Sequence, residues 1–224
     1  RATVSLQFHS KGMGKMVDKK KYVYVLLTDT GTVLNRIIKW FTNAPYNHAS
    51  IVFDEELKEI YSFGRKRPKN PLIAGFVRED VYYGAYRHFR NTHCLLLGIQ
   101  VDEIEYQNIR QTISDFERNK DQYTYNLIGL LGVLFQYPIG KKNSYFCSQF
   151  VSEVFRKSGI RLWDLPSALV QPNDFISHER FEHIYEGKLY DYPLLDQDLI
   201  KDDMPEEKYL TSLILEPLKK VLPY

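Results

Sequence analysis

Residues 143–159 read NSYFCSQFVSEVFRKSG and pass from a polar loop into an amphipathic helix. Its large apolar side chains recur at three- and four-residue spacing, which places them on one face: Phe146, Phe150, Val151, Val154 and Phe155. Gly159 follows the last turn, where glycine commonly ends a helix. The pattern predicts a helix over residues 146–158 with Cys147 in its first turn.

The position of Cys147 suggests a nucleophile. A first helical turn has N–H groups without intrahelical partners and lies at the positive end of the helix dipole, and both features favour a thiolate. The thiolate is the attacking form of cysteine, and the same N–H groups can stabilise an oxyanion beside the sulfur. The other interpretation is a small buried apolar side chain, which free cysteine often is.

His48 is the candidate base. It follows the turn-like residues 45–47 (PYN) and starts a predicted strand over residues 48–53, in which Ile51 and Phe53 alternate with their neighbours. Imidazole is the natural base for a thiol near neutral pH. A histidine at the surface, or one satisfied in the core, is the interpretation that the residue alone leaves open.

The remaining pattern predicts a mixed α+β protein, because strands and helices follow one another without regular βα alternation. The predicted strands are 22–28, 48–53, 59–63, 92–101 and 185–192. The predicted helices are 32–42, 102–119, 125–135, 146–158, a short helix at 172–177 and an amphipathic segment at 208–222. Residues 65–70 are basic and contain proline, so we expect a loop there.

Length and composition favour one domain. The chain has 224 residues, of which 44% are apolar and 26% charged, as in ordinary globular proteins. We divide it into a basic lead-in over residues 1–20 and a single domain over 21–224. The core of this domain spans about 22–192, and a C-terminal extension spans 193–224.

Charge and cysteine content narrow the setting. A net charge of +2 gives no strong field for nucleic acid, so we expect no nucleic-acid partner. With only two cysteines we expect no disulfide scaffold, and this favours a reducing compartment. No apolar run approaches the length of a transmembrane helix. We therefore expect a cytoplasmic protein, although a sequence that opens with Arg1 is also compatible with a removed signal.

The flanks of the two candidate residues carry a family resemblance. Residues 46–51 (YNHASI) and 145–151 (YFCSQFV) resemble the two signatures of the circularly permuted papain-like cysteine hydrolases. These are the YiiX/YaeF-like relatives of the NlpC-type cell-wall peptidases and of lecithin–retinol acyltransferase. In ordinary papain-like enzymes the cysteine helix precedes the histidine strand, whereas here His48 comes first. The resemblance covers roughly residues 22–192.

The resemblance implies a permuted papain-like (NlpC-like) fold, with an antiparallel sheet packed against the cysteine helix. It also implies a cysteine peptidase or amidase in which Cys147 and His48 act on a small peptide, amide or acyl substrate through a thioester. It implies no cofactor and no metal, and it is compatible with a bacterial source. The oligomeric state stays open.

The third catalytic group is open at this stage. The predicted hairpin partner of the histidine strand offers Ser62, where relatives often carry a stronger acceptor. Ser62 can accept a hydrogen bond, but it cannot stabilise an imidazolium as a carboxylate would. Glu79 and Asp80 are alternative orienting residues, and a Cys–His dyad without a third group is a further possibility.

Three residues are candidates for oxyanion or substrate contacts: Tyr125, Tyr46 and Ser148. Tyr123 is an alternative to Tyr125, and for either tyrosine a purely packing role is equally compatible.

Other chemistry fits the sequence less well. His178 and His183 are five residues apart and do not share a helix face as zinc-binding pairs do. The acidic stretch from Asp196 to Asp203 lacks a calcium-loop pattern. Cys94 lies in an apolar strand and is expected to be a core thiol.

Three functions remain as hypotheses. The first is a thiol hydrolase that cleaves an amide or peptide bond. The second is an acyltransferase or thioesterase that acts on lipid-like acyl groups. The third is a catalytically silent ligand-binding module on the same scaffold, for which the weak acceptor Ser62 is the main argument.

Overall fold

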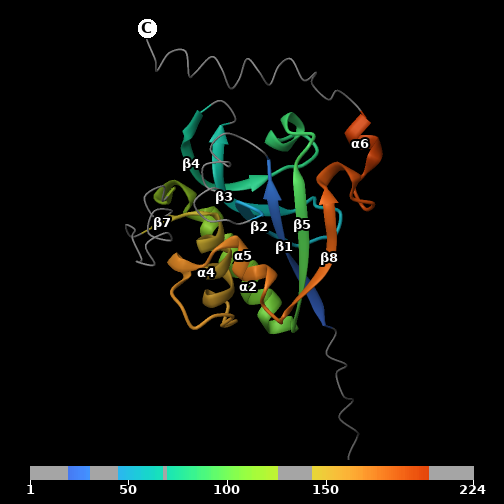
Figure 1. Cartoon of the computed structure of the whole chain (residues 1–224). Coiled ribbons are helices and arrows are strands. Elements are labelled where there is room, and N and C mark those ends of the chain that lie inside the picture. Colours follow the sequence, from blue (N-terminus) through green and yellow to red (C-terminus); the bar gives the residue numbers. More distant parts are fainter. Residues whose placement is uncertain (1–19, 31–44, 68–69, 126–142, 202–224) are drawn as a thin grey trace, which may run out of the picture.

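The fold is a six-stranded antiparallel sheet combined with helices (Figure 1). The computed structural model describes residues 20–30, 45–67, 70–125 and 143–201. In spatial order the strands are β4 (Asn70–Glu79), β3 (Ile60–Arg67), β2 (His48–Val52), β1 (Lys21–Asp29), β5 (His93–Val101) and β8 (Phe181–Lys188). Two short strands, β6 (Thr124–Tyr125) and β7 (Ser144–Tyr145), form a separate parallel pair.

The described part of the chain contains four α-helices: α2 (Glu103–Arg118), α4 (Cys147–Lys157), α5 (Pro172–Ile176) and α6 (Gln197–Lys201). Short 3-10 helices are η1 (Ala85–His88), η2 (Lys120–Gln122), η3 (Ser167–Leu169) and η4 (Leu189–Asp191). The predicted α+β class is thereby confirmed. Within the described segments, no helix has the length and apolarity needed to cross a bilayer.

Both faces of the central strands are covered, because side chains along β1, β2, β3 and β5 alternate between two apolar clusters. On β2, Ala49 and Ile51 pack into the cluster that contains the buried faces of α2 and α4. Val52 packs into the second cluster, which is covered by residues 81–86 and by the segment that follows β8. The described part of the C-terminal extension contributes Leu195 to this second cluster.

The predicted helix with Cys147 in its first turn is confirmed as α4, and its C-terminal end shows why it stops. Gly159 adopts a φ of +89°, a left-handed conformation that favours glycine. The N–H of Ile160 then bonds to the carbonyl oxygen of Phe155 at 2.9 Å, which satisfies one of the last carbonyls of the helix.

An aromatic cluster holds α4 against the sheet. Phe63 of β3 is fully buried, and its ring centroid lies 5.1 Å from that of Phe150 on α4. The same ring contacts Phe116 of α2 at 6.0 Å and Tyr145 at 5.2 Å. Because these rings come from separate elements, their packing fixes α4 relative to β3.

The ladder between β2 and β3 is short, and it leaves the start of β2 unpaired on the side of β3. The two strands pair only at Ile51 with Tyr61 and at Val52 with Ile60. His48, at the other end of β2, pairs with Thr28 of β1. Since α4 packs against both β2 and β3, its N-terminus lies near the part of β2 that does not pair with β3.

Most strand predictions in the described regions are confirmed to within a few residues, but two need correction. The loop expected over residues 65–70 is too long, because β3 continues to Arg67 and β4 begins at Asn70, while residues 68–69 lie outside the described residues. The last strand is shifted, since β8 spans Phe181–Lys188 rather than residues 185–192. The predicted helix 32–42, most of the predicted helix 125–135, the segment 208–222 and nearly all of the lead-in lie outside the described residues.

We predict that Phe63→Ala destabilises the fold by about 3–5 kcal/mol, because it removes a fully buried ring and leaves a cavity between elements. Urea denaturation followed by circular dichroism measures this change. Tyr83→Ala, which alters a side chain that is 59% exposed, is the control and is expected to change the unfolding free energy little. Equal effects of the two substitutions would contradict the role given to the aromatic cluster.

Candidate active site

The thiol of Cys147 lies at the buried N-terminus of α4, where the local sequence leaves N–H groups available. The residue is 4% exposed. The N-cap residue is Phe146, which has no side-chain oxygen to occupy the N–H groups of the first turn. The backbone N–H groups of Ala49 and Ser148 hydrogen-bond the sulfur instead. The thiol also lies 3.9 Å from the carbonyl oxygen of Asn47.

His48 lies between a carboxylate and this thiol. Its Nε2 is 2.8 Å from Oε1 of Glu79, and Ser50 Oγ lies 3.3 Å from the same nitrogen. The imidazole also hydrogen-bonds the thiol of Cys147. This sequence of thiol, imidazole and carboxylate is one that can supply a nucleophile, a base and an orienting group.

Glu79 reaches His48 from β4, two strands away from β2. Its side chain is 13% exposed, and that of His48 is 21% exposed. Oε1 also accepts a hydrogen bond from Ser62 Oγ at 2.8 Å, and Oε2 accepts one from Ser50 Oγ at 2.6 Å. The carboxylate is thus held on both oxygens.

The electrostatics of the site favour an ion pair. Burial alone lowers the pKa of His48, but the charge of Glu79 and hydrogen bonds with Cys147 and Glu79 raise it from 6.5 to about 10. Burial alone raises the pKa of the Cys147 thiol, but the hydrogen bond with His48, the imidazolium charge and the two N–H groups lower it below its ordinary value. The pair is therefore biased towards thiolate and imidazolium.

Glu79 stays ionised in this setting. Burial would raise the pKa of its carboxyl group, but the charge of His48 and hydrogen bonds from His48, Ser50 and Ser62 lower it. A carboxylate that remains charged can both orient the imidazole and stabilise its protonated form.

Ser62, the predicted third group, contacts the carboxylate beside the imidazole and not the imidazole itself. Its hydroxyl donates to Glu79 and not to His48. The alternative that the sequence left open, Glu79, is the residue that contacts the ring. Asp80, the other alternative, instead accepts hydrogen bonds from the backbone N–H groups of Tyr82 and Tyr83.

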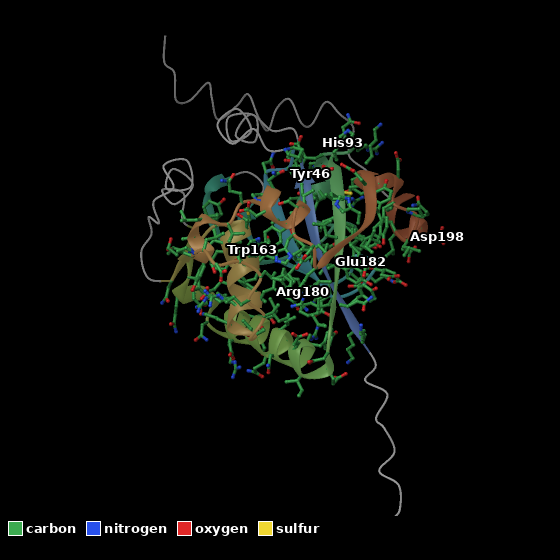
Figure 2. All side chains as sticks on the ribbon, turned by 60° about the horizontal axis from the view of Figure 1, so that its bottom comes forward. Tyr46, His93, Trp163, Arg180, Glu182 and Asp198 are labelled. Atoms are coloured by element: carbon green, nitrogen blue, oxygen red, sulfur yellow. The ribbon has the colours of Figure 1, made fainter. Side chains whose placement is uncertain are left out.

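The three residues predicted for oxyanion or substrate contacts have different positions. Ser148 turns its hydroxyl to the carbonyl oxygen of Val170 at 2.7 Å, so only its backbone N–H is directed at the thiol. Tyr46 donates to Glu186 of β8 at 2.7 Å and lies at the same end of the molecule as His93 (Figure 2). Tyr125 is half-buried and packs against the main core cluster.

Sequence reasoning missed two residues that contact Glu79. Ser50 lies within the quoted histidine motif, two residues after His48, so strand periodicity already places it on the histidine face. Tyr86 lies in η1, within a segment whose sequence pattern is ambiguous, and its hydroxyl is 3.3 Å from Oε2 of Glu79. No local signal in the sequence indicates the second residue.

The other chemistry-bearing groups lead to no second site. Across the described residues, no group of three His, Cys, Asp or Glu side chains is arranged to hold a metal ion. Cys94 is buried, and burial together with the charge of Glu186 raises the pKa of its thiol to about 12. This thiol is inert compared with that of Cys147.

A cavity of about 510 Å³ lies at the opposite end of α4 and is lined by Ser152, Arg156, Trp163 and Pro166 among others. Its cations already have partners. Arg156 forms two hydrogen bonds with Glu153 at 2.7 and 2.8 Å, and Arg161 pairs with Asp164 at 3.0 Å. The cavity is therefore separate from the thiol and has no free charge to bind an anion.

No family model matches this chain, and no curated protein matches it.

We predict that Glu79→Gln lowers the pKa of His48 towards its ordinary value, because the neutral amide cannot stabilise the imidazolium. The Cys147 thiolate then becomes less abundant at low pH. We expect alkylation of Cys147 by iodoacetamide at pH 6 to slow about tenfold or more, since one pKa unit corresponds to a factor of ten. Mass spectrometry of the modified peptide measures the rate.

Glu182→Gln is the matched control for this change. Glu182 lies on the edge strand β8, is exposed (Figure 2) and contacts Tyr22 rather than the candidate site. It is expected to leave the alkylation rate unchanged. Cys94 serves as an internal reference thiol in every sample. A Glu79→Gln protein that reacts like the unmodified chain would refute the role of Glu79.

Gly64 gives a second prediction, because it lies beside the contacts between His48 and Glu79. A Cβ atom at this position would lie 3.3 Å from Ser62 Oγ, 3.4 Å from Oε1 of Glu79 and 3.6 Å from Cε1 of His48. In Gly64→Ala the Ser62 hydroxyl must therefore give way slightly. Since this hydroxyl donates to Glu79, we expect the contact with His48 to be disturbed and Cys147 to alkylate roughly tenfold more slowly.

Gly98→Ala introduces similar crowding elsewhere in the same sheet, where the added Cβ would meet Ile184 and Tyr22 at 3.2 Å. This control is expected to leave the alkylation rate of Cys147 unaltered. If both variants slow the reaction equally, the effect of Gly64→Ala comes from general strain in the sheet and not from the candidate site.

Proposed function

We propose that this protein is a thiol-dependent hydrolase that cleaves an amide or peptide bond through Cys147, His48 and Glu79. The observation that carries the proposal is the 2.8 Å contact between His48 Nε2 and Glu79 Oε1, combined with the hydrogen bond from the same imidazole to the Cys147 thiol. This arrangement supplies an activated nucleophile, a proton carrier and an orienting charge.

The proposed reaction follows from these positions. The Cys147 sulfur attacks the carbonyl carbon, and the electron pair of the C=O bond moves to the oxygen. The backbone N–H groups of Ala49 and Ser148, which lie at the sulfur, can stabilise the negative oxygen that forms. The imidazolium of His48 then protonates the leaving nitrogen as the C–N bond breaks, which leaves a thioester on Cys147 and a free amine.

In hydrolysis of the thioester, His48 accepts a proton instead of donating one. Neutral His48 removes a proton from water, the resulting oxygen nucleophile attacks the thioester carbon, and the C–S bond breaks. The products are a free carboxylic acid and the Cys147 thiolate beside an imidazolium. Glu79 keeps the ring oriented and stabilises its charged form in both halves of the reaction.

A permuted papain-like fold is part of the proposal. What supports it is an antiparallel sheet packed against a helix that begins at Cys147, with the base on a strand that comes earlier in the chain. The sequence resemblance around His48 and Cys147 supports the same assignment.

The two other hypotheses are affected differently. The argument for a silent binding module was the weak acceptor Ser62, and the carboxylate of Glu79 beside the imidazole removes that argument. The acyltransferase or thioesterase hypothesis shares the thioester step but takes a lipid-like acyl group, and an acyltransferase passes that group to an alcohol or amine in place of water. Product analysis in the presence of added acceptor distinguishes the two reactions.

We predict that Cys147→Ala abolishes turnover of amide or peptide substrates while the protein remains folded. A library of short peptides, with release of free amine as the signal, tests the unmodified chain and the variant. Cys94→Ala is the matched control, because it removes the other buried thiol, and it is expected to retain activity. Turnover by Cys147→Ala equal to that of the unmodified chain would exclude a thiol mechanism.

The pH profile of turnover is a further prediction. The rate is expected to rise through the lowered pKa of Cys147, which lies below 9.0, as the thiolate forms. It is expected to fall as the pH passes about 10, where His48 loses the proton that the leaving group needs. Alkylation of Cys147 needs only the thiolate, so it is expected to show the acid limb without the alkaline one. An alkaline limb near pH 7 would contradict the raised pKa of His48.

A further inference from the structure

We propose that Ser50 and Tyr86 are positioning residues that hold the carboxylate of Glu79 in the orientation in which it contacts His48, and that they thereby help to keep the imidazole protonated. The inference deepens the proposed function, since it concerns the regulation of the same site by pH. The residues act through Glu79 and do not touch the reacting atoms.

The geometry at Oε2 of Glu79 carries the inference. Two hydroxyl groups reach this oxygen, which does not contact the imidazole: Ser50 Oγ at 2.6 Å and Tyr86 OH at 3.3 Å. Ser50 is fully buried, and Tyr86 is 6% exposed. Oε1 receives His48 and Ser62. The carboxylate is therefore surrounded by four groups that can all donate.

A third hydroxyl group extends this chain of hydrogen bonds. Thr28 Oγ1, which is fully buried on β1, lies 3.3 Å from Tyr86 OH. If the single proton of Tyr86 is given to Glu79, Thr28 must be the donor to Tyr86. The phenol keeps that proton, because burial and the charge of Glu79 raise the pKa of Tyr86 well above 10.

Donors on a carboxylate favour its charged form and oppose its protonation. The proton shared between His48 and Glu79 is therefore kept on the imidazole, where the reaction uses it. Titratable groups face the pair from three elements: Cys147 from α4 and Glu79 from β4 act on His48, while His48 and Tyr86 of η1 act on Glu79. Without a donor at Oε2 the carboxylate is free to turn away from the ring, which weakens its attraction for the imidazolium.

The test measures the pH at which His48 is half protonated, by NMR of the full chain with labelled histidine. The His48 signal is assigned by its loss in a His48→Gln variant. The unmodified chain is expected to keep its imidazolium to a pH of about 10. We expect Ser50→Ala to lower this midpoint by about one pH unit, because the carboxylate loses the 2.6 Å contact that holds it against the ring. Tyr86→Phe, which removes the longer contact, is expected to lower it by less.

Each variant has a matched control with the same chemical change at another buried site. Ser152→Ala removes a hydroxyl that bonds Ser167, and Tyr82→Phe removes one that donates to the carbonyl oxygen of Glu56. Both are expected to leave the His48 midpoint unchanged. Near-UV circular dichroism checks that each variant is folded, and Tyr86→Phe tests the inference if Ser50→Ala does not fold.

The outcomes separate this inference from the proposed function. A lowered His48 midpoint in Ser50→Ala or Tyr86→Phe, but not in the controls, supports the inference even in a chain that turns over no peptide. A midpoint unchanged in both variants overturns it, even where Cys147 proves to be a competent nucleophile. A midpoint that shifts equally in the controls overturns it as well, because the effect is then a general response to lost buried hydroxyl groups.

Discussion

A carboxylate moved out of water needs donors that replace its hydration, and the surroundings of Glu79 meet this requirement. Its four hydrogen-bonding partners come from three elements other than its own: His48 and Ser50 from β2, Ser62 from β3 and Tyr86 from η1. None of these contacts forms unless β2, β3 and β4 are in their observed register. The protonation of the imidazole therefore depends on the order and register of these strands.

Strand periodicity explains how these groups meet. Glu79 pairs with Ile60, and Ser62 lies two residues further along β3 on the same face. His48 and Ser50 share one face of β2 for the same reason. A shift of β4 by one residue would turn Glu79 to the opposite face and leave the imidazole without a counter-ion. The aromatic cluster around Phe63 opposes such a shift, because Phe76 of β4 packs against that ring and against Phe150 of α4.

Local sequence signals point to Cys147 and His48 more directly than to the carboxylate that contacts the imidazole. Cys147 and His48 are visible because local signals, a helix start and a strand start, place each of them at an element boundary. Glu79 lies at the end of a strand that follows a basic, proline-containing segment, which predicts a loop. Its distance from His48 depends on the pairing of three strands, and register of this kind is decided by long-range packing. The face on which Ser50 lies can be predicted from strand periodicity once the strand is known. The contact of Tyr86 with Glu79 instead depends on how η1 folds back over the sheet.

The two cysteines show why burial alone says little about reactivity. Both thiols are almost fully buried, and burial alone raises the pKa of each. Cys94 has only the like charge of Glu186 nearby, so its pKa rises further. Cys147 has an imidazolium and two backbone N–H groups, and these outweigh the cost of burial and reverse the direction of the shift. The difference depends on Glu79, because without its charge His48 would be neutral in the same buried position and could no longer stabilise a thiolate.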